Sequence, residues 1–350
     1  MTATVAWDRP ALAALAALVA VRMVAGFQFH SVAVVAPLLV AELGLSYTEA
    51  GSLIGAYVLP AVLLSIPGGL VIQRFGERPV LLASLALTVV GGALTALAPG
   101  FFSMFAARLV AGTGAALVQI VVLKMATDRF MGSRMSTATG TVLGAWPLGI
   151  ALALALLGGV AQAAGWRAAL GVAAGYAVFA LLAAWRLGGV FAGAEPGAAG
   201  RAAATTVAGE PPGSRLVGLG PAVAISISWM VLNVGFTAFI AFAPTWLTSA
   251  GRSLEAAGFA VSLSGWALVL MQPWGGWLAD RLGRPSLVLA IGCLVAGAAI
   301  AVSLATGGAL PFFLLAGVAM GFTPGVMGAQ LALSAPPARR AVAFGFFATG

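Results

Sequence analysis

Few residues of this sequence could take part in chemistry, and those deepest in its apolar runs are basic or titratable. Arg22, His30 and Arg108 lie inside long apolar runs. None of the nine acidic residues lies in the middle of such a run; they are Asp8, Glu42, Glu49, Glu77, Asp128, Glu195, Glu210, Glu255 and Asp280. A buried ionisable group is costly and usually marks a functional pathway. Because positive charge without a carboxylate attracts anions, the pattern predicts a small anion as ligand.

Each of these residues also has a purely structural interpretation. Arg22 could contact the anion or pair with backbone carbonyl groups. Arg108 and Gln119 lie eleven residues apart, about 20° round a helix, so their stripe faces either a cavity or a neighbouring helix. His30, a residue type that titrates near neutral pH, could carry a coupled proton or be a neutral core residue. The sequence leaves these alternatives open.

The elements that position these residues must be membrane helices. Hydrophobic residues make up 61% of the chain and charged residues 7%, and the mean hydropathy is +1.08. Continuous apolar runs of about 20 residues predict spanning α-helices, whereas a membrane barrel would show shorter, alternating segments. The predicted helices cover residues 11–40, 51–72, 79–98, 101–125, 136–162, 166–187, 217–248, 257–279, 286–306 and 309–332.

One charged stretch occurs twice. PGGLVIQRFGERP, from Pro67 to Pro79, returns as PWGGWLADRLGRP, from Pro273 to Pro285. At a constant offset of 207 residues, Gly69, Arg74 and Gly76 align with Gly276, Arg281 and Gly283, and three further matches are Pro37 with Pro244, Gly51 with Gly258 and Gly114 with Gly321. A period this long indicates a duplicated domain.

The duplication divides the chain into two halves. Residues 1–190 form the first six-helix half, and residues 191–216, rich in Gly, Pro and Ala, form a predicted cytoplasmic linker. The second half, residues 217–350, contains four full helices and the start of an eleventh. If each half has the same length, the offset of 207 places the end of the second half about 45 residues beyond Gly350. The repeat therefore predicts that about 45 residues are missing from the second half.

The distribution of basic residues predicts the orientation. If the helices alternate in direction, twelve of the 17 basic residues lie at one membrane face: Arg9, Arg74, Arg78, Arg129, Arg134, Arg186, Arg201, Arg215, Arg281, Arg284, Arg339 and Arg340. Only Arg167 and Arg252 lie at the other. By the positive-inside rule, the first face and the N-terminus are cytoplasmic, and the protein lies in the cytoplasmic (inner) membrane.

Two six-helix halves, a linker, and the motif Gly-x-x-x-Asp-Arg-x-Gly-Arg after the second helix of each half, complete in the second and partial in the first, resemble the major facilitator superfamily of secondary transporters. The second copy matches at Gly276, Asp280, Arg281, Gly283 and Arg284, whereas the first has Gln73 and Glu77 in place of the acidic and a basic residue. RLVAGTG at 108–114 is similar to the pattern of helix four in the family. GFQFHSVAVVAPLL and LGLSYTEAGSLIGAY resemble its cyanate and nitroimidazole permease-like branch.

The resemblance implies a gate at the repeated stretch. A carboxylate at Asp280 can contact the positive N-terminus of helix five, which follows Arg134 in the opposite half, while the cytoplasmic side is closed. The alternative is that Asp280 and its arginines only fix topology. The predicted gating residues are Gly69, Gln73, Arg74, Gly76, Arg134, Gly276, Asp280, Arg281, Gly283 and Arg284.

The repeat also predicts the depth of the binding site. The offset of 207 places His30 opposite Thr237 and Gly26 opposite Asn233, near the midplane where duplicated transporters bind substrate. The predicted substrate-binding residues are Arg22, Gln28, His30, Arg108, Gln119, Asn233 and Thr237. Tyr57, Trp146, Trp266 and Gln272 are weaker candidates, because aromatic and polar residues of helices more often serve packing.

The function predicted is secondary active transport of a small anion by alternating access. One His, one Cys and no buried carboxylate do not assemble a catalytic or metal site, and no Walker-type loop indicates ATP as the energy source. The predicted partners are a small anionic substrate, a coupled proton and the bilayer, with no cofactor, metal or nucleic acid, and the protein is expected to be a monomer. The alternatives are a transport-inactive sensor or partner-binding protein, and an exporter of uncharged, drug-like compounds.

Overall fold

The computed structural model describes residues 9–130, 134–186, 220–251, 254–335 and 339–347, and these ranges contain helices and turns but no strand. The all-α fold predicted from the sequence is therefore confirmed. The helices are α1 (Arg9–Leu43), α2 (Tyr47–Phe75), α3 (Glu77–Leu97), α4 (Phe101–Arg129), α5 (Met135–Arg186), α8 (Gly220–Ser249), α9 (Leu254–Leu282), α10 (Pro285–Ala305), α11 (Leu310–Gly321), α12 (Thr323–Ser334) and α13 (Arg340–Phe347). Seven apolar segments in this part of the chain are long enough to span a membrane.

The ten predicted passes correspond to these helices once two interruptions are taken into account. α5 contains the predicted passes 136–162 and 166–187, separated at Gly165, whose φ of 82° is outside the helical range. The pass predicted at 309–332 is divided into α11 and α12 at Phe322. Pro324 lies in the first turn of α12, where a missing N–H is tolerated and helps to start a new helix.

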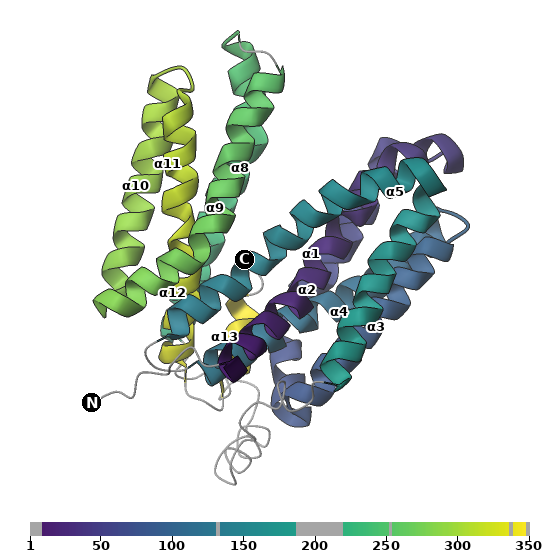
Figure 1. The fold of residues 1–350 in the computed structure, drawn as a ribbon, viewed down its shortest axis with the longest axis horizontal. Coiled ribbons are helices and arrows are strands. Elements are labelled where there is room, and N and C mark those ends of the chain that lie inside the picture. Colours follow the sequence, from purple (N-terminus) through teal and green to yellow (C-terminus); the bar gives the residue numbers. More distant parts are fainter. Residues whose placement is uncertain (1–8, 131–133, 187–219, 252–253, 336–338, 348–350) are drawn as a thin grey trace.

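The helices form two groups that meet at one end and diverge at the other (Figure 1). α1 to α5 make one group, and α8 to α12 make the other. Between them, α5 packs against α9 and α12, and α13 packs against α2. The predicted linker 191–216 falls almost entirely outside the described residues, so the domain boundaries stay a prediction.

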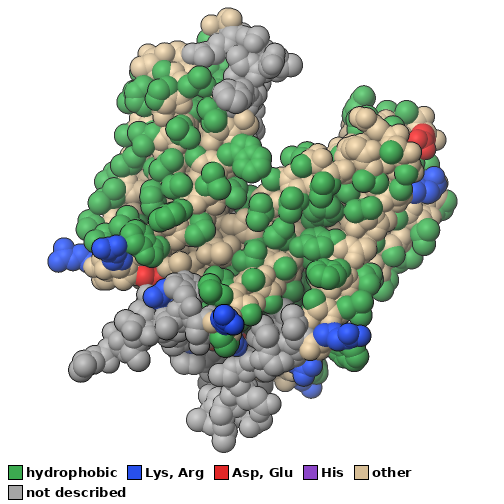
Figure 2. Space-filling model, in the orientation of Figure 1, with side chains coloured by type: hydrophobic (Ala, Val, Ile, Leu, Met, Phe, Trp, Pro, Cys, Tyr) green, Lys and Arg blue, Asp and Glu red, His purple; other side chains and the backbone are tan. Residues whose placement is uncertain are grey.

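The charges lie mainly at the end where the two groups meet. Figure 2 shows most of the visible Lys and Arg side chains along that end and a hollow between the groups at the opposite end. On the face shown in Figure 2, the visible side chains along the sides of both groups are mostly hydrophobic, as expected for surfaces that face lipid. At the diverging end, the indole of Trp166 donates a hydrogen bond to Glu42 (2.9 Å), and Arg167 stacks on the same indole.

Two glycines hold α1 tightly against α5. A side chain at Gly26 would overlap the carbonyl oxygen of Trp146, and one at Gly149 would overlap that of Met23. Small residues at such crossings let helix backbones approach closely in a membrane, where no hydrophobic effect drives association. This crossing fixes the relative position of Arg22, one turn before Gly26, and the indole of Trp146.

Candidate functional site

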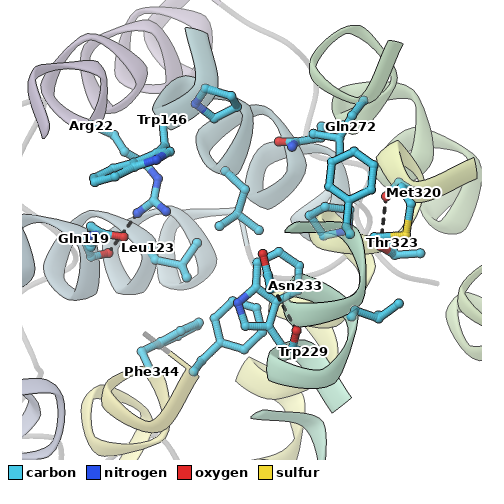
Figure 3. A pocket seen from close by; sticks show the side chains of 17 residues that line it. Arg22, Gln119, Leu123, Trp146, Trp229, Asn233, Gln272, Met320, Thr323 and Phe344 are labelled. Atoms are coloured by element: carbon cyan, nitrogen blue, oxygen red, sulfur yellow. Dashed lines mark hydrogen bonds between the residues drawn. The ribbon is translucent and has the colours of Figure 1, made fainter. Parts of the chain in front are cut away.

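A cavity of about 320 Å³ lies between the two groups of helices. α1, α4 and α5 provide one wall, and α8, α9, α11, α12 and α13 provide the other (Figure 3). Its lining consists of Arg22, Gln119, Leu123, Leu143, Trp146, Pro147, Trp229, Leu232, Asn233, Phe236, Leu268, Gln272, Met320, Thr323, Pro324, Phe344 and Phe347. Arg22 is the one charged residue of this lining. The volume is near the lower limit of known small-molecule sites, about 300 Å³.

Arg22 is buried in the wall of the cavity with most of its hydrogen-bonding capacity unused. Its side chain is 5% exposed. Nη1 donates to the carbonyl oxygen of Gln119 at 3.3 Å, and Nε has no partner among the described residues. A guanidinium has five N–H donors and cannot be neutralised by deprotonation at physiological pH. The site can therefore stabilise a negative charge that enters the cavity.

Arg108 is as deeply buried as Arg22, but its guanidinium donors are paired. Its Nε, Nη1 and Nη2 donate to the carbonyl oxygens of Leu53 (3.1 Å), Gln28 (2.9 Å) and Phe29 (3.1 Å). The guanidinium also lies 4.3 Å from the ring centroid of Tyr57, at cation–π distance. Arg108 is not part of the cavity lining. Its contacts correspond to the helix-contact alternative, in which it ties α4 to α1 and α2.

Gln28 and His30 also lie away from the cavity. Nε2 of Gln28 donates to the carbonyl oxygens of Thr88 (3.3 Å) and Ala173 (3.4 Å), which joins α1 to α3 and α5. His30 is half-buried beside Phe29, and its Nδ1 has no partner in the described part of the chain. Neither residue lines the cavity.

Of the remaining predicted residues, Gln119 and Asn233 do line the cavity. The side chain of Thr237 lies outside the described residues. Trp146 and Gln272, treated as weaker candidates from the sequence, belong to the lining as well. The amide oxygen of the buried Gln272 has no partner within the described ranges.

Several aromatic residues of the lining were not predicted from the sequence. Trp229 aligns with Arg22 at the repeat offset of 207, so the duplication contained the signal that identifies it. Its ring stacks on that of Phe347 at 4.8 Å between centroids. Phe344 and Phe347 carried no such signal, because α13 reaches the cavity through its packing against α2, α4 and α8, which are far from it in the sequence.

The two groups are joined at one end by Asp280 of α9. Oδ2 of Asp280 accepts hydrogen bonds from the backbone N–H of Thr137 (2.8 Å) and from its hydroxyl (2.6 Å), and Oδ1 accepts from the N–H of Ser136 (3.2 Å). These N–H groups belong to the first turn of α5, where the helix dipole favours a negative charge. This is the contact that the resemblance implied for a closed cytoplasmic side.

Glycines bring the backbones together at this junction. A side chain at Gly276, one turn before Asp280, would overlap the backbone of Ser136, and one at Gly140 would overlap the carbonyl of Gln272. Gly325 of α12 packs on Gly140 in the same way. The carboxylate of Asp280 reaches the N-terminus of α5 because these three positions lack side chains.

A second junction is formed by ionic contacts. Nη1 of Arg340, at the start of α13, lies 2.9 Å from Oδ1 of Asp128 in α4. Oδ2 of Asp128 lies 2.8 Å from Nζ of Lys124, which also pairs with Glu77. The family has a basic residue at the position of Glu77. Here the acidic side chain of Glu77 is paired with Lys124, so its negative charge has a counter-ion.

The other predicted gating residues surround the two repeated turns. Gly76 and Gly283 occupy equivalent positions and both adopt positive φ, 84° and 61°, which a residue with a side chain rarely tolerates. Arg74, Arg281 and Arg284 are exposed, Gly69 is buried, and Gln73 and Arg134 are half-buried.

The fold and the cavity define a multi-pass, all-helical membrane protein made of two groups of helices around a central site. The chain belongs to the Major Facilitator Superfamily, whose sequence model matches residues 18–350. The narrower resemblance to the cyanate and nitroimidazole permease-like branch stays a prediction.

Two characterised relatives are similar to parts of the chain. A hexuronate transporter of Bacillus subtilis (strain 168) is 24% identical over 137 residues, 39% of this chain and 32% of that protein. A methylenomycin A resistance protein of the same strain is 28% identical over 149 residues, 41% of this chain and 31% of that protein. These matches cover about a third of the length of each relative.

Solved structures share the fold over nearly the whole chain. The proton:xylose symporter XylE bound to 6-bromo-6-deoxy-D-glucose superposes with a TM-score of 0.66 at 19% identity, covering 97% of this chain and 86% of that one. The fucose:proton symporter FucP of E. coli superposes with a TM-score of 0.70 at 12% identity, covering 97% and 89%. At these identities the similarity establishes the fold.

Proposed function

We propose that this protein is a secondary active transporter that moves a small anion across the cytoplasmic membrane by alternating access. One observation carries the proposal: the buried Arg22 faces a cavity between the two halves, and among the described residues its Nε has no partner and no acidic residue lines that cavity. A buried cation without a counter-ion is unfavourable, so an entering anion would be bound strongly. Membership of the superfamily supports the transport function.

The conformation fits one end state of such a cycle. The halves meet at the end that carries Asp280 and diverge at the other (Figure 1). If the basic end is cytoplasmic, as the positive-inside rule predicts, this state is closed to the cytoplasm and its N-terminus is cytoplasmic. Opening to the cytoplasm would then require the Asp280 and Arg340 contacts to break, which gives these residues their gating role.

A coupled proton is part of the proposal. The names of XylE and FucP identify those structures as proton symporters, and His30 is the one histidine of this chain. Its half-buried ring with an unpartnered Nδ1 is suited to bind a proton at one stage of the cycle. If His30 does so, His30→Gln should abolish the effect of a pH gradient on uptake while leaving exchange of the anion intact.

The main alternative is export of uncharged, drug-like compounds. The mostly apolar lining of the cavity and the similarity to a methylenomycin A resistance protein favour this alternative. The second alternative is a transport-inactive sensor on the same scaffold. Such a protein would bind its ligand without transporting it.

Flux into proteoliposomes separates these functions. The purified chain would be reconstituted and tested with a panel of radiolabelled small anions and uncharged analogues, with and without a pH gradient. We expect uptake of an anion that Arg22→Gln reduces and that Arg186→Gln, the same change at an exposed arginine, does not. Flux of uncharged compounds alone would support the exporter, and binding without flux would support the sensor.

A further inference from the structure

The cavity that binds the proposed anion has a wall that is mainly apolar and aromatic. Besides Arg22, its polar side chains are Gln119, Asn233, Gln272 and Thr323, and the other twelve of the 17 lining residues are hydrophobic. Trp229 and Phe347 form a stacked pair in one wall, and Trp146 lies beside Arg22 in the opposite one (Figure 3). A small inorganic anion would contact Arg22 and leave most of this surface in contact with water.

The charge of the lining limits the charge of the ligand. Arg22 contributes one positive charge, and no other residue of the lining formed by the described part of the chain is acidic or basic. A monoanion would neutralise that charge. A dianion would bring a second charge with no partner into an apolar site, at a cost that its single ion pair does not offset.

The hydrogen-bonding groups of the wall limit how polar the ligand can be. The amide nitrogen of Asn233 already donates to the carbonyl oxygen of Trp229 (2.9 Å), and the hydroxyl of Thr323 donates to that of Met320 (2.9 Å). The several hydroxyls of a sugar acid would each need a partner here, more than the remaining amides of Gln119 and Gln272 provide, and a buried polar group left unpaired costs about 1–3 kcal/mol. The wall therefore disfavours the sugar acids that the name of the hexuronate transporter denotes.

The volume limits the size of the ligand. A cavity of about 320 Å³ is near the lower limit of known small-molecule sites, about 300 Å³. A carboxylate on a single six-membered ring fits within this volume, and an aromatic ring gains additional stabilisation from the edges and faces of Trp146, Trp229 and Phe347.

We infer that the ligand is an amphipathic monoanion, a monocarboxylate on one aromatic ring, with its carboxylate at Arg22 and its ring between Trp146 and the stacked pair Trp229 and Phe347. This inference rests on the proposed function and specifies its substrate class. It also explains why one cavity combines an incompletely paired cation with walls that suit an uncharged ligand.

The test is equilibrium binding of radiolabelled benzoate to the purified full chain, with competition by four unlabelled probes. Acetate lacks the ring, benzyl alcohol lacks the charge, phthalate carries a second charge and galacturonate replaces the ring by hydroxyls. We expect benzoate to bind at least about ten times more tightly than each of the four, because ring burial and charge pairing each contribute a factor of that order.

Variants relate the selectivity to individual residues. Arg22→Gln should weaken benzoate binding about 10- to 150-fold, and Arg22→Lys, which keeps the charge, should restore most of it. Trp229→Ala should lower the ratio of benzoate to acetate affinity, a ratio that a general loss of stability does not change. Trp185→Ala, at an exposed position of α5, is the matched control and should leave the ratio unchanged.

The outcomes distinguish this inference from the proposed function. Acetate, phthalate or galacturonate binding as tightly as benzoate would overturn the substrate class and leave anion transport standing. Benzyl alcohol binding as tightly as benzoate, with Arg22→Gln without effect, would overturn both. Failure of every anion to bind would likewise overturn both.

Discussion

The carboxylate of Asp280 in the second half accepts two hydrogen bonds from Thr137 in the first, one from its backbone N–H (2.8 Å) and one from its hydroxyl (2.6 Å). Because Thr137 lies in the first turn of α5, the negative charge meets the positive end of the helix dipole. This side chain thus forms one polar junction between the halves, and the Arg340–Asp128 ion pair forms another. Several of the expected effects below depend on the contact of Asp280.

Asp280→Asn should open the end of the molecule where the halves meet. The asparagine keeps an acceptor but loses the charge, which weakens the contact by about 1–2 kcal/mol and raises the open population about five- to thirty-fold. Thr139, fully buried in α5 beside Gly328, becomes accessible when the halves separate. The rate at which a maleimide labels Thr139→Cys, in a Cys293→Ser background, measures this opening.

Gln73→Ala is the comparison for Asp280→Asn, since Gln73 occupies the equivalent position of the first half. In the Gln73→Ala variant, we expect the labelling rate of Thr139→Cys to stay within a factor of about three of the rate in the protein without this substitution. Equal rates in the two variants would show that the gate does not depend on the carboxylate.

Gly276→Ala should separate the same two helices by a different mechanism. The added methyl group would overlap the backbone of Ser136, and overpacking of this kind costs about 1–3 kcal/mol. Gly265→Ala in the same helix is the matched control, because no heavy atom of another described element lies within 4 Å of the added methyl group. Labelling of Thr139→Cys should rise in the first variant only, and a similar rise in both would rule out the close approach.

Arg340 and Asp128 should behave as a coupled pair. The ion pair is partly buried and links α13 to α4, so we expect a coupling energy of about 0.5–1 kcal/mol that decreases at high salt. A double-mutant cycle with Arg340→Gln and Asp128→Asn measures this coupling energy from the midpoints of thermal unfolding. Additive effects of the two substitutions would show that the pair does not hold the halves together.

Arg22 and Arg108 should show opposite effects on binding and stability. Arg108→Gln leaves the carbonyl groups of Leu53, Gln28 and Phe29 without their donors, at a cost of about 1–3 kcal/mol each, so the thermal midpoint should fall strongly. Arg22→Gln should lower affinity with a smaller effect on the midpoint. Both quantities would be measured on the same purified samples. A loss of stability with unchanged affinity in Arg22→Gln would remove Arg22 from the site.

The sequence by itself determined the helices and the duplication. Long apolar runs leave the backbone no alternative to helices in a bilayer, because every N–H and C=O must be paired within the segment. The repeated turns could also be located in advance, since Gly76 and Gly283 occupy equivalent positions where a positive φ requires glycine. Trp229 could have been predicted from the same repeat, as the counterpart of Arg22.

Only the tertiary structure decided which buried arginine faces the cavity. Arg22 and Arg108 look alike in sequence, each a lone cation inside an apolar run. Helical periodicity fixes which residues share one face of a helix, but the packing of all the helices fixes where that face points. Arg108 and Gln119 share a stripe, yet about 16 Å of helix separates them, and only Gln119 reaches the cavity. Phe344 and Phe347 line it because α13 packs across the boundary between the halves, a contact between segments that are far apart in the chain.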